Sequence, residues 1–181
     1  MTPKILALIN TTSHPFSIQT ERLELLPFTK SICEATLQGD YSWFDALQLN
    51  SSDYWPDEDI LESLPRTLNT LTKIHQPTGF ESWMIIEKDT RTIIGDVGFK
   101  GYQFIQNTCD LGYGIVKEKR RQGFAFEACE AIVQWALANQ QLESITAATY
   151  HDNNGSIRLL EKLQFIRIAQ DEEFIYWELK K

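Results

Sequence analysis

A cluster of positive charge at Lys117–Arg121 lies just before a glycine and is the clearest sign of chemistry in the chain. Four of these five residues are cations, and Gly123 and Ala125 follow where a strand pattern has given way to a helical one. The unpaired N–H groups and the dipole of a helix start attract anions, and guanidinium groups there add whole charges. The pattern predicts a diphosphate site, although the cations taken alone equally fit a solvated turn.

The nature of the phosphate ligand is narrowed by what the chain lacks and by its charge. The sequence contains neither the G-x-x-x-x-G-K-[ST] loop nor the glycine triplet of dinucleotide-binding domains. Its formal net charge is -8, which repels a nucleic acid backbone. We therefore expect a small phosphate-bearing ligand of another kind and no nucleic acid partner.

The composition is typical of one folded domain. With 181 residues, 43% of them hydrophobic, the chain can bury a substantial core. Its three cysteines, Cys33, Cys109 and Cys129, have no C-x-x-C spacing and are accompanied by few histidines, so we expect buried free thiols and no metal site. No apolar stretch approaches the roughly 18 residues of a membrane span, which favours a cytoplasmic protein without a membrane partner.

The segments that must hold the loop begin with a strand and two helices. We expect residues 1–18 to form an extension and residues 19–181 to form a single domain. The first elements are predicted as a strand over Arg22–Pro27, a helix from Thr29 or Ser31 toward Leu49, and a helix over Asp57–Lys73 that is broken or kinked near Pro65.

Alternating and helical patterns then build the body around the loop. Trp83–Ile86 and Thr92–Phe99 flank a charged turn and predict an antiparallel hairpin. The later elements are predicted as a strand over Cys109–Val116, a helix whose apolar face carries Ala125, Ala128, Cys129, Ile132 and Ala136, a strand over Ser144–Tyr150, a helix over Asn154–Leu163, and strands over Phe165–Ala169 and Phe174–Leu179. The strand at Ser144 follows its helix closely enough for a parallel crossover.

Two motifs resemble the GNAT superfamily of N-acetyltransferases, and within it the Rim-type branch of ribosomal-protein acetyltransferases. Arg120–Ala125 resembles the family's loop of Arg or Gln, two residues, Gly, one residue, and Gly or Ala. Asn153–Phe165 resembles the branch's N-x-x-S, a helix and K-L-G-F, with Gln164 in place of the usual glycine; a further glycine often seen in the loop is Arg121 here. The remaining similarities are Thr20–Leu23, Gly112-Tyr113 and Glu127-Ala128, within a likeness that spans Ile18–Leu179.

The resemblance implies an α/β (α+β) fold and acetyl-CoA as the cosubstrate. The fold has a mixed central sheet flanked by helices, with the chain order β-α-α-β-β-β-α-β-α-β-β. In the family, the strands that correspond to Cys109–Val116 and Ile145–Tyr150 splay apart, and pantetheine inserts between them. The residues implied to bind the cofactor are Ile115, Val116, Arg120, Arg121, Gln122, Gly123, Phe124, Ala125, Asn153 and Ser156.

The activity implied is transfer of an acetyl group to a primary amine by direct attack in a ternary complex. The backbone N–H of Val116 would stabilise the oxyanion, and Ser156 would protonate the leaving thiolate while Asn153 holds the cofactor or the serine in place. Tyr150 and His151, near the same strand end, are alternatives for the acid. On the residues alone, Asn153 or Ser156 merely caps a helix.

A carboxylate is expected to remove a proton from the incoming ammonium. The resemblance offers Asp110, at an acidic position common in the branch at the start of the central strand. An ordinary Asp titrates near about 3.9 and needs partial burial to serve well. Asp96 and a chain of water molecules are the alternatives, and Asp110 also fits a solvated strand end.

The acceptor is expected to enter beside the first two helices and the hairpin. There Tyr54-Trp55-Pro56 either lines a groove or packs in the core. The acidic balance favours an amine-bearing acceptor, and a small amine, an antibiotic, an amino acid and a protein N-terminus all fit, in a monomer or a homodimer. The alternative function is a non-catalytic acyl-CoA-binding sensor or interaction module, which has no turnover to lose on Ser156→Ala.

Overall fold

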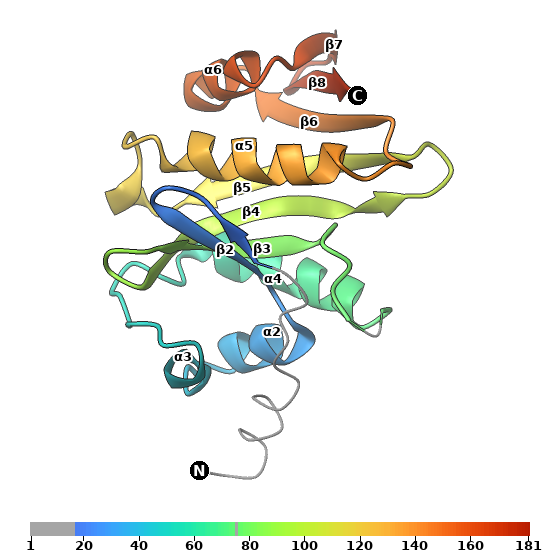
Figure 1. Cartoon of the computed structure of the whole chain (residues 1–181). Helices are drawn as coiled ribbons and strands as arrows, with labels where there is room; N and C mark the ends of the chain where they lie inside the picture. The colour runs from blue at the N-terminus through green and yellow to red at the C-terminus, as the bar shows by residue number, and fades with distance from the viewer. Residues whose placement is uncertain (1–16, 75) are drawn as a thin grey trace.

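The computed structural model describes residues 17–74 and 76–181, which form an eight-stranded mixed sheet and its flanking helices (Figure 1). The strands are β1 (Ile18–Gln19), β2 (Leu23–Pro27), β3 (Ser82–Glu87), β4 (Thr92–Gln103), β5 (Thr108–Ile115), β6 (Ser144–Tyr150), β7 (Ile166–Gln170) and β8 (Phe174–Lys180). Their order across the sheet is β1-β2-β3-β4-β5-β6-β8-β7, and the pair β5 and β6 is parallel while the other neighbours are antiparallel.

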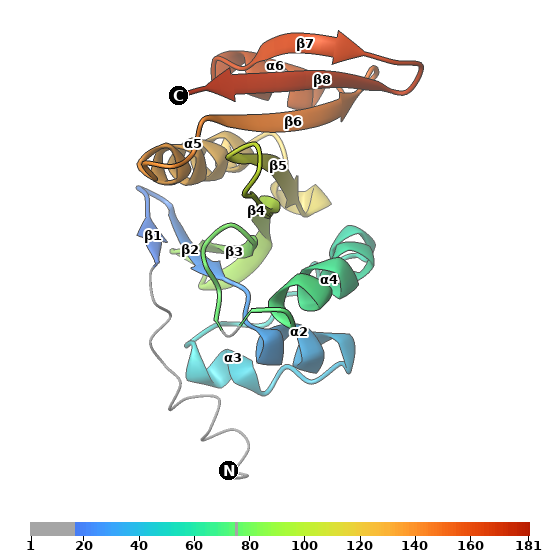
Figure 2. The ribbon, with the colours of Figure 1, turned by 90° about the vertical axis from the view of Figure 1, so that its right-hand side faces the viewer.

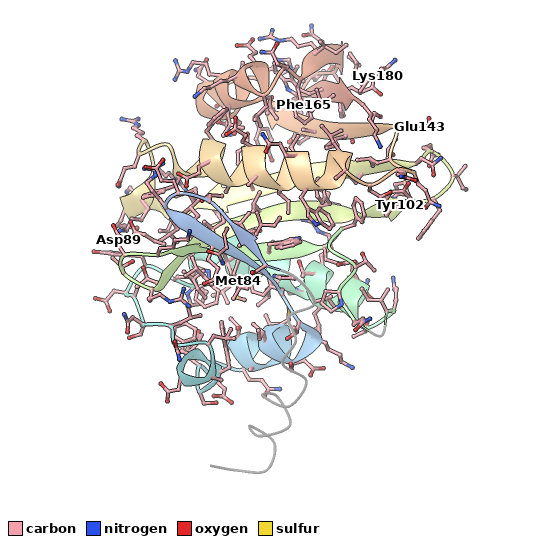
Figure 3. All side chains as sticks on the ribbon, in the orientation of Figure 1. Met84, Asp89, Tyr102, Glu143, Phe165 and Lys180 are labelled. Atoms are coloured by element: carbon pink, nitrogen blue, oxygen red, sulfur yellow. The ribbon has the colours of Figure 1, made fainter. Side chains whose placement is uncertain are left out.

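Helices cover both faces of the sheet. They are α2 (Lys30–Leu37), α3 (Trp43–Ala46), α4 (Glu58–Leu71), α5 (Phe124–Leu137) and α6 (Asn154–Lys162), with a 3-10 turn η1 (Lys117–Lys119) before α5. The helix α5 lies against one face and α4 against the other (Figure 2). The core fills the space between these layers, where Met84 of β3 is fully buried (Figure 3). The sheet therefore offers the two helices separate surfaces.

The first predicted helix is wrong in length. The segment forms two short helices instead, because α2 ends at Leu37 and Gly39 then adopts the left-handed conformation at φ 71°. The helix α3 follows, and its Trp43 and Phe44 pack edge to face against each other in a cluster with Trp55. The second predicted helix, α4, continues through Pro65 without a break and is capped by Asp57, whose carboxylate accepts the Ile60 N–H at 3.1 Å.

The predicted strands are present, with ends displaced by a few residues at most. One strand was not predicted: β1 pairs Ile18 with Leu25, so the sheet begins within the predicted extension. The rest of that extension, residues 1–16, lies outside the described residues. The strand β4 runs to Gln103, farther than expected, and pairs with β5 through a bulge between Phe99 and Tyr102.

The predicted apolar face of α5 is largely buried. Ala128, Cys129, Ile132 and Ala136 are buried, as their spacing predicted, while Ala125 at the start of the helix is only partly buried and packs against the core. All three cysteines are free and buried, and burial raises the pKa of the Cys109 thiol to about 12. None of the helices in residues 17–74 and 76–181 is long and apolar enough to cross a bilayer.

The sheet opens between β5 and β6. The two strands pair over three residues, from Thr108 opposite Ser144 to Asp110 opposite Thr146. Beyond this point β5 continues to Ile115 and β6 to Tyr150 without pairing with each other. One edge of each strand is therefore left without a neighbouring strand.

Candidate active site

The loop between β5 and α5 presents an uncapped helix start. Two residues in the left-handed region, Arg121 at φ 63° and Gly123 at φ 86°, turn the chain into α5. Gly123 occupies the N-cap position and gives no side-chain cap. The first N–H groups of the helix therefore have no side-chain acceptor, which is the arrangement that binds an anion.

The two loop arginines differ in how they are engaged. The Arg120 side chain turns back, where its Nε donates to the Ile115 carbonyl at 2.7 Å and its Nη2 lies 3.5 Å from an oxygen of Asp59. The Arg121 guanidinium is exposed and has no partner among the described residues. Of the two predicted phosphate-binding cations, Arg121 is the one whose side chain is free.

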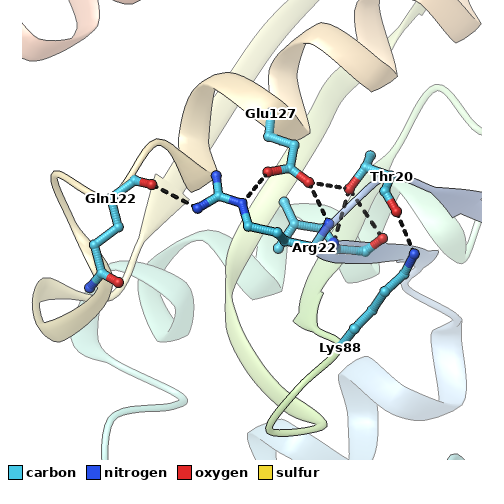
Figure 4. A network of polar contacts seen from close by, with 6 residues as sticks. Thr20, Arg22, Lys88, Gln122 and Glu127 are labelled. Carbon is cyan, nitrogen blue, oxygen red and sulfur yellow. Dashed lines mark hydrogen bonds and ion pairs between the residues drawn. The ribbon is translucent and has the colours of Figure 1, made fainter.

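Side chains from the turn between β1 and β2 form a network of polar contacts with the loop and with the start of α5 (Figure 4). Arg22 donates from Nη1 to the Gln122 carbonyl at 2.9 Å and from Nε to Glu127 at 2.7 Å. Its guanidinium also lies over the Phe124 ring, 4.3 Å from the ring centre. One side chain thus contacts the loop, the first residue of α5 and the first turn of that helix.

Glu127 is the acceptor at the centre of this network. Besides the Arg22 side chain, the Arg22 N–H at 2.8 Å and the Thr20 hydroxyl at 2.6 Å donate to it, and Lys88 donates to the Thr20 carbonyl. Burial raises the pKa of Glu127, but the hydrogen bonds from Thr20 and Arg22 outweigh burial and hold the pKa below its usual value. The carboxylate is therefore ionised and fully engaged.

The predicted oxyanion donor is not free. The Val116 N–H donates to the Ile94 carbonyl at 2.9 Å, within the pairing of β4 with the end of β5. Because an antiparallel ladder alternates, the residues on either side of each bonded position turn their N–H groups away from the partner strand. Tyr113 and Ile115 therefore point theirs into the opening beside β6, which the Val116 N–H does not face.

Ser156 and Tyr113 meet across the opening. Asn153 caps α6 by accepting the Ser156 N–H at 3.1 Å, so the helix-cap interpretation of this motif is confirmed. The Tyr113 hydroxyl is shielded from solvent and makes no hydrogen bond of good geometry among the described residues. Burial raises the pKa of Tyr113, and the neighbouring Ser156 hydroxyl partly offsets that rise. Sequence reasoning gave Tyr113 no role.

Tyr150 and His151, the alternatives to Ser156 as the general acid, contact the C-terminal hairpin. The Tyr150 ring packs on Phe174, with 4.6 Å between the ring centres. A ring nitrogen of His151 lies 2.9 Å from the Asp171 carbonyl. Both side chains thus have partners on or next to β8, whereas Ser156 lies beside Tyr113.

A cavity of about 290 Å³ lies between α4 and the sheet, on the face opposite α5. Its floor includes Gly112 and Gly114 of β5, and the Asp96 carboxylate lies over Gly114, so that a Cβ built there would come within 3.3 Å of Asp96 Oδ1. The other Asp96 oxygen accepts the Ser82 hydroxyl at 3.0 Å. Burial raises the pKa of Asp96 to about 6, although Ser82 acts in the opposite direction.

Asp110 is held by other groups. Lys100 pairs with one of its oxygens, and the Thr146 hydroxyl donates to the other at 3.0 Å. It lies where β5 and β6 part, outside the set of residues that line the cavity. The structure therefore favours Asp96 as the carboxylate that can meet an acceptor.

The segment Tyr54-Trp55-Pro56 does not line this cavity. Trp55 is buried and packs with Trp43 and Phe44, while Tyr54 is exposed. The core-packing interpretation is confirmed, and the groove interpretation is wrong for this cavity. Within the described part of the chain, no group of His, Cys, Asp or Glu is arranged to hold a metal ion.

The opening between two parallel strands, the uncapped helix start and the cavity that contains Asp96 all adjoin β5. The chain belongs to the acetyltransferase (GNAT) domain family, which matches residues 22–166. The sequence resemblance to this superfamily, and the mixed α/β fold that it implied, are confirmed.

Relatives and solved structures agree with this assignment. The chain is 32% identical to the uncharacterized N-acetyltransferase YjdG of Bacillus subtilis (strain 168) over 88% of this chain and 95% of the relative. Its fold is similar to that of the ribosomal-protein-S5-alanine acetyltransferase from Vibrio fischeri, with a TM-score of 0.66, 18% identity and coverage of 91% and 96%.

A third similar protein was solved with a bound cofactor. The ribosomal L7/L12 alpha-N-protein acetyltransferase RimL, in complex with coenzyme A, has a TM-score of 0.65, 16% identity and coverage of 91% and 98%. Family and relatives together make this protein an acetyl-CoA-dependent N-acetyltransferase.

Proposed function

We propose that the protein acetylates a primary amine by direct attack of the amine on the acetyl thioester, with both substrates bound together. The observation that carries this proposal is that the opening and the cavity share the segment 112–114 of β5. A thioester in the opening and an amine over Gly114 would meet at the same strand. The domain formed by residues 19–181 would supply both sites.

Acetyl-CoA would bring the activated acyl group, and the loop fits its diphosphate. The uncapped N–H groups of α5 and the free Arg121 guanidinium would hold the phosphates. Gln122, Gly123, Phe124 and Ala125 would contribute backbone, while Asn153 and Ser156 would lie beside the pantetheine. The unpaired edge of β5 at Tyr113 and Ile115 would hydrogen-bond that arm, as a strand does.

Asp96 is the general base in this proposal, in place of Asp110. Its pKa of about 6 leaves it ionised at neutral pH and basic enough to take a proton from an incoming ammonium. The neutral amine then attacks the carbonyl carbon, the C–N bond forms, and the C–S bond breaks. The attacking nitrogen then loses a second proton, which replaces the proton that Ser156 gives to the departing thiolate, so that the products are the amide and the free thiol.

Backbone and hydroxyl groups at the opening would stabilise the oxyanion and protonate the departing thiolate. The N–H of Tyr113 or Ile115 would donate to the oxyanion, the role first given to Val116. Ser156 would deliver a proton to the thiolate, with the Tyr113 hydroxyl beside it as the group that positions or replenishes that proton. Asn153 holds the start of α6, and through it Ser156, in place.

The acceptor in this proposal is a small-molecule amine or a protein N-terminus, the latter by analogy with the ribosomal-protein enzymes of similar fold. The test is release of free thiol from acetyl-CoA against a panel of amines and peptides with free N-termini. Thiol release that depends on the acceptor and is lost in Asp96→Asn supports the proposal. Binding of acetyl-CoA with no release for any acceptor would instead favour a sensor.

A further inference from the structure

The charged groups around the acceptor cavity are nearly all paired within the protein. Glu81 accepts the Thr78 N–H at 2.8 Å, the Thr78 hydroxyl at 2.7 Å and the Gly79 N–H at 3.0 Å. Lys100 pairs with Asp110, on a neighbouring strand. These groups stabilise the fold and have little capacity left for a ligand.

The cavity also contains Asp59, Asp96 and Arg66, which differ in how they are satisfied. Asp59 is close to Arg120 of the cofactor loop. Asp96 has one oxygen bonded to Ser82, while its Oδ1 has no hydrogen-bond donor among the described residues. The Arg66 guanidinium has neither an ion pair nor a hydrogen bond within residues 17–74 and 76–181. One hydrogen-bond acceptor, Asp96 Oδ1, and one cation, Arg66, therefore lie in the same cavity without a hydrogen-bond or ion-pair partner among the described residues.

The position of Arg66 on α4 places its side chain in the lining of the cavity. The residues of α4 that line the cavity follow the spacing of one helix face and are Asp59, Ser63, Arg66, Thr67 and Thr70. The positive charge of Arg66 acts on Asp96, whose pKa it lowers, although burial has the larger and opposite effect. The Thr67 hydroxyl beside it has no hydrogen-bond partner within the described ranges and can donate to the same anion.

We infer that the acceptor carries a carboxylate near its amine, and that Arg66 binds this carboxylate while Asp96 takes the ammonium. This inference rests on the proposed N-acetyltransfer at the same cavity. A guanidinium binds a carboxylate through two parallel hydrogen bonds, which gives orientation as well as affinity. The carboxylate is that of a free amino acid or that of an acidic residue next to a peptide N-terminus. Amines without an anion leave Arg66 unpaired.

The experiment measures kcat and KM for thiol release with two matched pairs of acceptors. One pair is an amino acid and its carboxamide, and the other is a peptide with Glu or Gln as its second residue. The two members of the first pair also differ in the pKa of their amines. Each acceptor is therefore compared with itself in wild type and in Arg66→Met, so that this difference cancels.

Arg66→Met is expected to raise KM for the carboxylate-bearing member by about tenfold or more, the scale of a hydrogen bond to a charged group. The KM of the uncharged member should change by less than about twofold, since it has no anion for Arg66 to bind. Any change in kcat that follows from the loss of the Arg66 charge beside Asp96 should be the same for both members of a pair. Arg66→Lys should recover part of the loss, because it keeps the charge and loses the paired geometry. Lys73→Met, which removes a cation just beyond α4 and outside the cavity lining, is the matched control.

The outcomes separate this inference from the proposed function. If the amino acid pair responds to Arg66→Met, the source is a free amino acid, and if only the peptide pair responds, it is an acidic N-terminal segment. Equal KM changes for charged and uncharged acceptors would overturn the carboxylate assignment while acetyl transfer stands. Absence of thiol release with every acceptor would overturn both.

Discussion

The cofactor loop between β5 and α5 and the acceptor cavity between α4 and the sheet differ in how far their charged side chains are paired within the protein. At the loop, Arg22 and Glu127 are engaged with each other and with the backbone, and the groups left for a ligand are the N–H groups of α5 and the Arg121 guanidinium (Figure 4). In the cavity, the groups left over are the side chains of Asp96 and Arg66. In the proposed function, the loop would therefore bind its ligand mainly through backbone N–H groups, and the cavity would bind its ligand through side chains.

This difference predicts that the loop controls the affinity for CoA and that the cavity controls the rate of acetyl transfer. A loop that is fixed before binding loses little conformational entropy when a diphosphate arrives, so in the proposed function its supporting residues would set the Kd for CoA. A partly buried carboxylate without a second donor is stabilised when a ligand ammonium reaches it, so Asp96 would set the rate. Changes at the loop should act on cofactor Kd, and changes in the cavity should act on kcat and on acceptor KM.

The largest effect is expected from Asp96→Asn, which removes the proposed base and keeps the shape of the side chain. We expect kcat/KM to fall by about 10² to 10⁴, the usual contribution of a general base, with the Kd for CoA unchanged. In wild type, kcat/KM should fall as the pH drops through about 6, because the protonated carboxyl cannot accept a proton, and the variant should lack this limb. A variant that retains full activity would place the base elsewhere, and Asp110→Asn is the matched comparison.

Gly123→Ala should break the preformed loop. A side chain at φ 86° costs about 1–2 kcal/mol, and the added Cβ would lie 3.3 Å from Arg22 Nη2. We expect the Kd for CoA, measured by calorimetry, to rise about tenfold as the loop leaves its binding conformation. Gly39→Ala is the control, because it imposes the same left-handed strain at φ 71° outside the site, with nothing within 4 Å of the new Cβ. Equal CoA affinity in both variants would argue against the loop as the cofactor site.

The sequence predicted the parts of the loop that depend on local pattern. The glycine after the basic turn, the helix that follows and the cap at Asn153 are each encoded within a few residues. The parts of the loop's support that could not be predicted are contacts between segments that lie far apart in the sequence. Arg22 and Glu127 lie 105 positions apart, and although both segments carried the family resemblance, nothing local indicated that they bind each other.

The revised expectations for Val116 and Asp110 have a similar origin. Which N–H groups of β5 face the opening depends on the phase of its pairing with β4, and a shift of one residue reverses the answer. Asp96 and Asp110 both lie on predicted strands, and the difference between them is set by Lys100 beside one and by the α4 side of the cavity beside the other. The break after α2 rests on Gly39, a weak signal because isolated glycines occur within helices.

Arg22→Met tests whether the network behind the loop positions it. The variant keeps the length and apolar contact of the side chain and loses its hydrogen bonds to the Gln122 carbonyl and to Glu127. We expect the Kd for CoA to rise about fivefold, equivalent to about one hydrogen bond, with acceptor KM unchanged. Glu127→Gln should produce a similar shift, because it weakens the same contact from the other side. A change in acceptor KM in place of CoA Kd would contradict the division between the two regions.

The smallest expected effect is on stability, again at Asp96. A folded-state pKa of about 6, above the ordinary 3.8, means that the folded protein binds this proton more tightly than the unfolded chain. The ionised carboxylate therefore destabilises the fold above about pH 6, and this penalty vanishes as the pH falls toward 4. Asp96→Asn should be more stable than wild type at pH 7.5, by at most the roughly 3 kcal/mol that a rise in pKa from 3.8 to about 6 represents, an advantage that shrinks toward pH 4.5 in urea unfolding. A variant that is less stable than wild type at both pH values would show that Asp96 supports the fold, and Asp96 would then resemble the paired Arg22 and Glu127 at the loop.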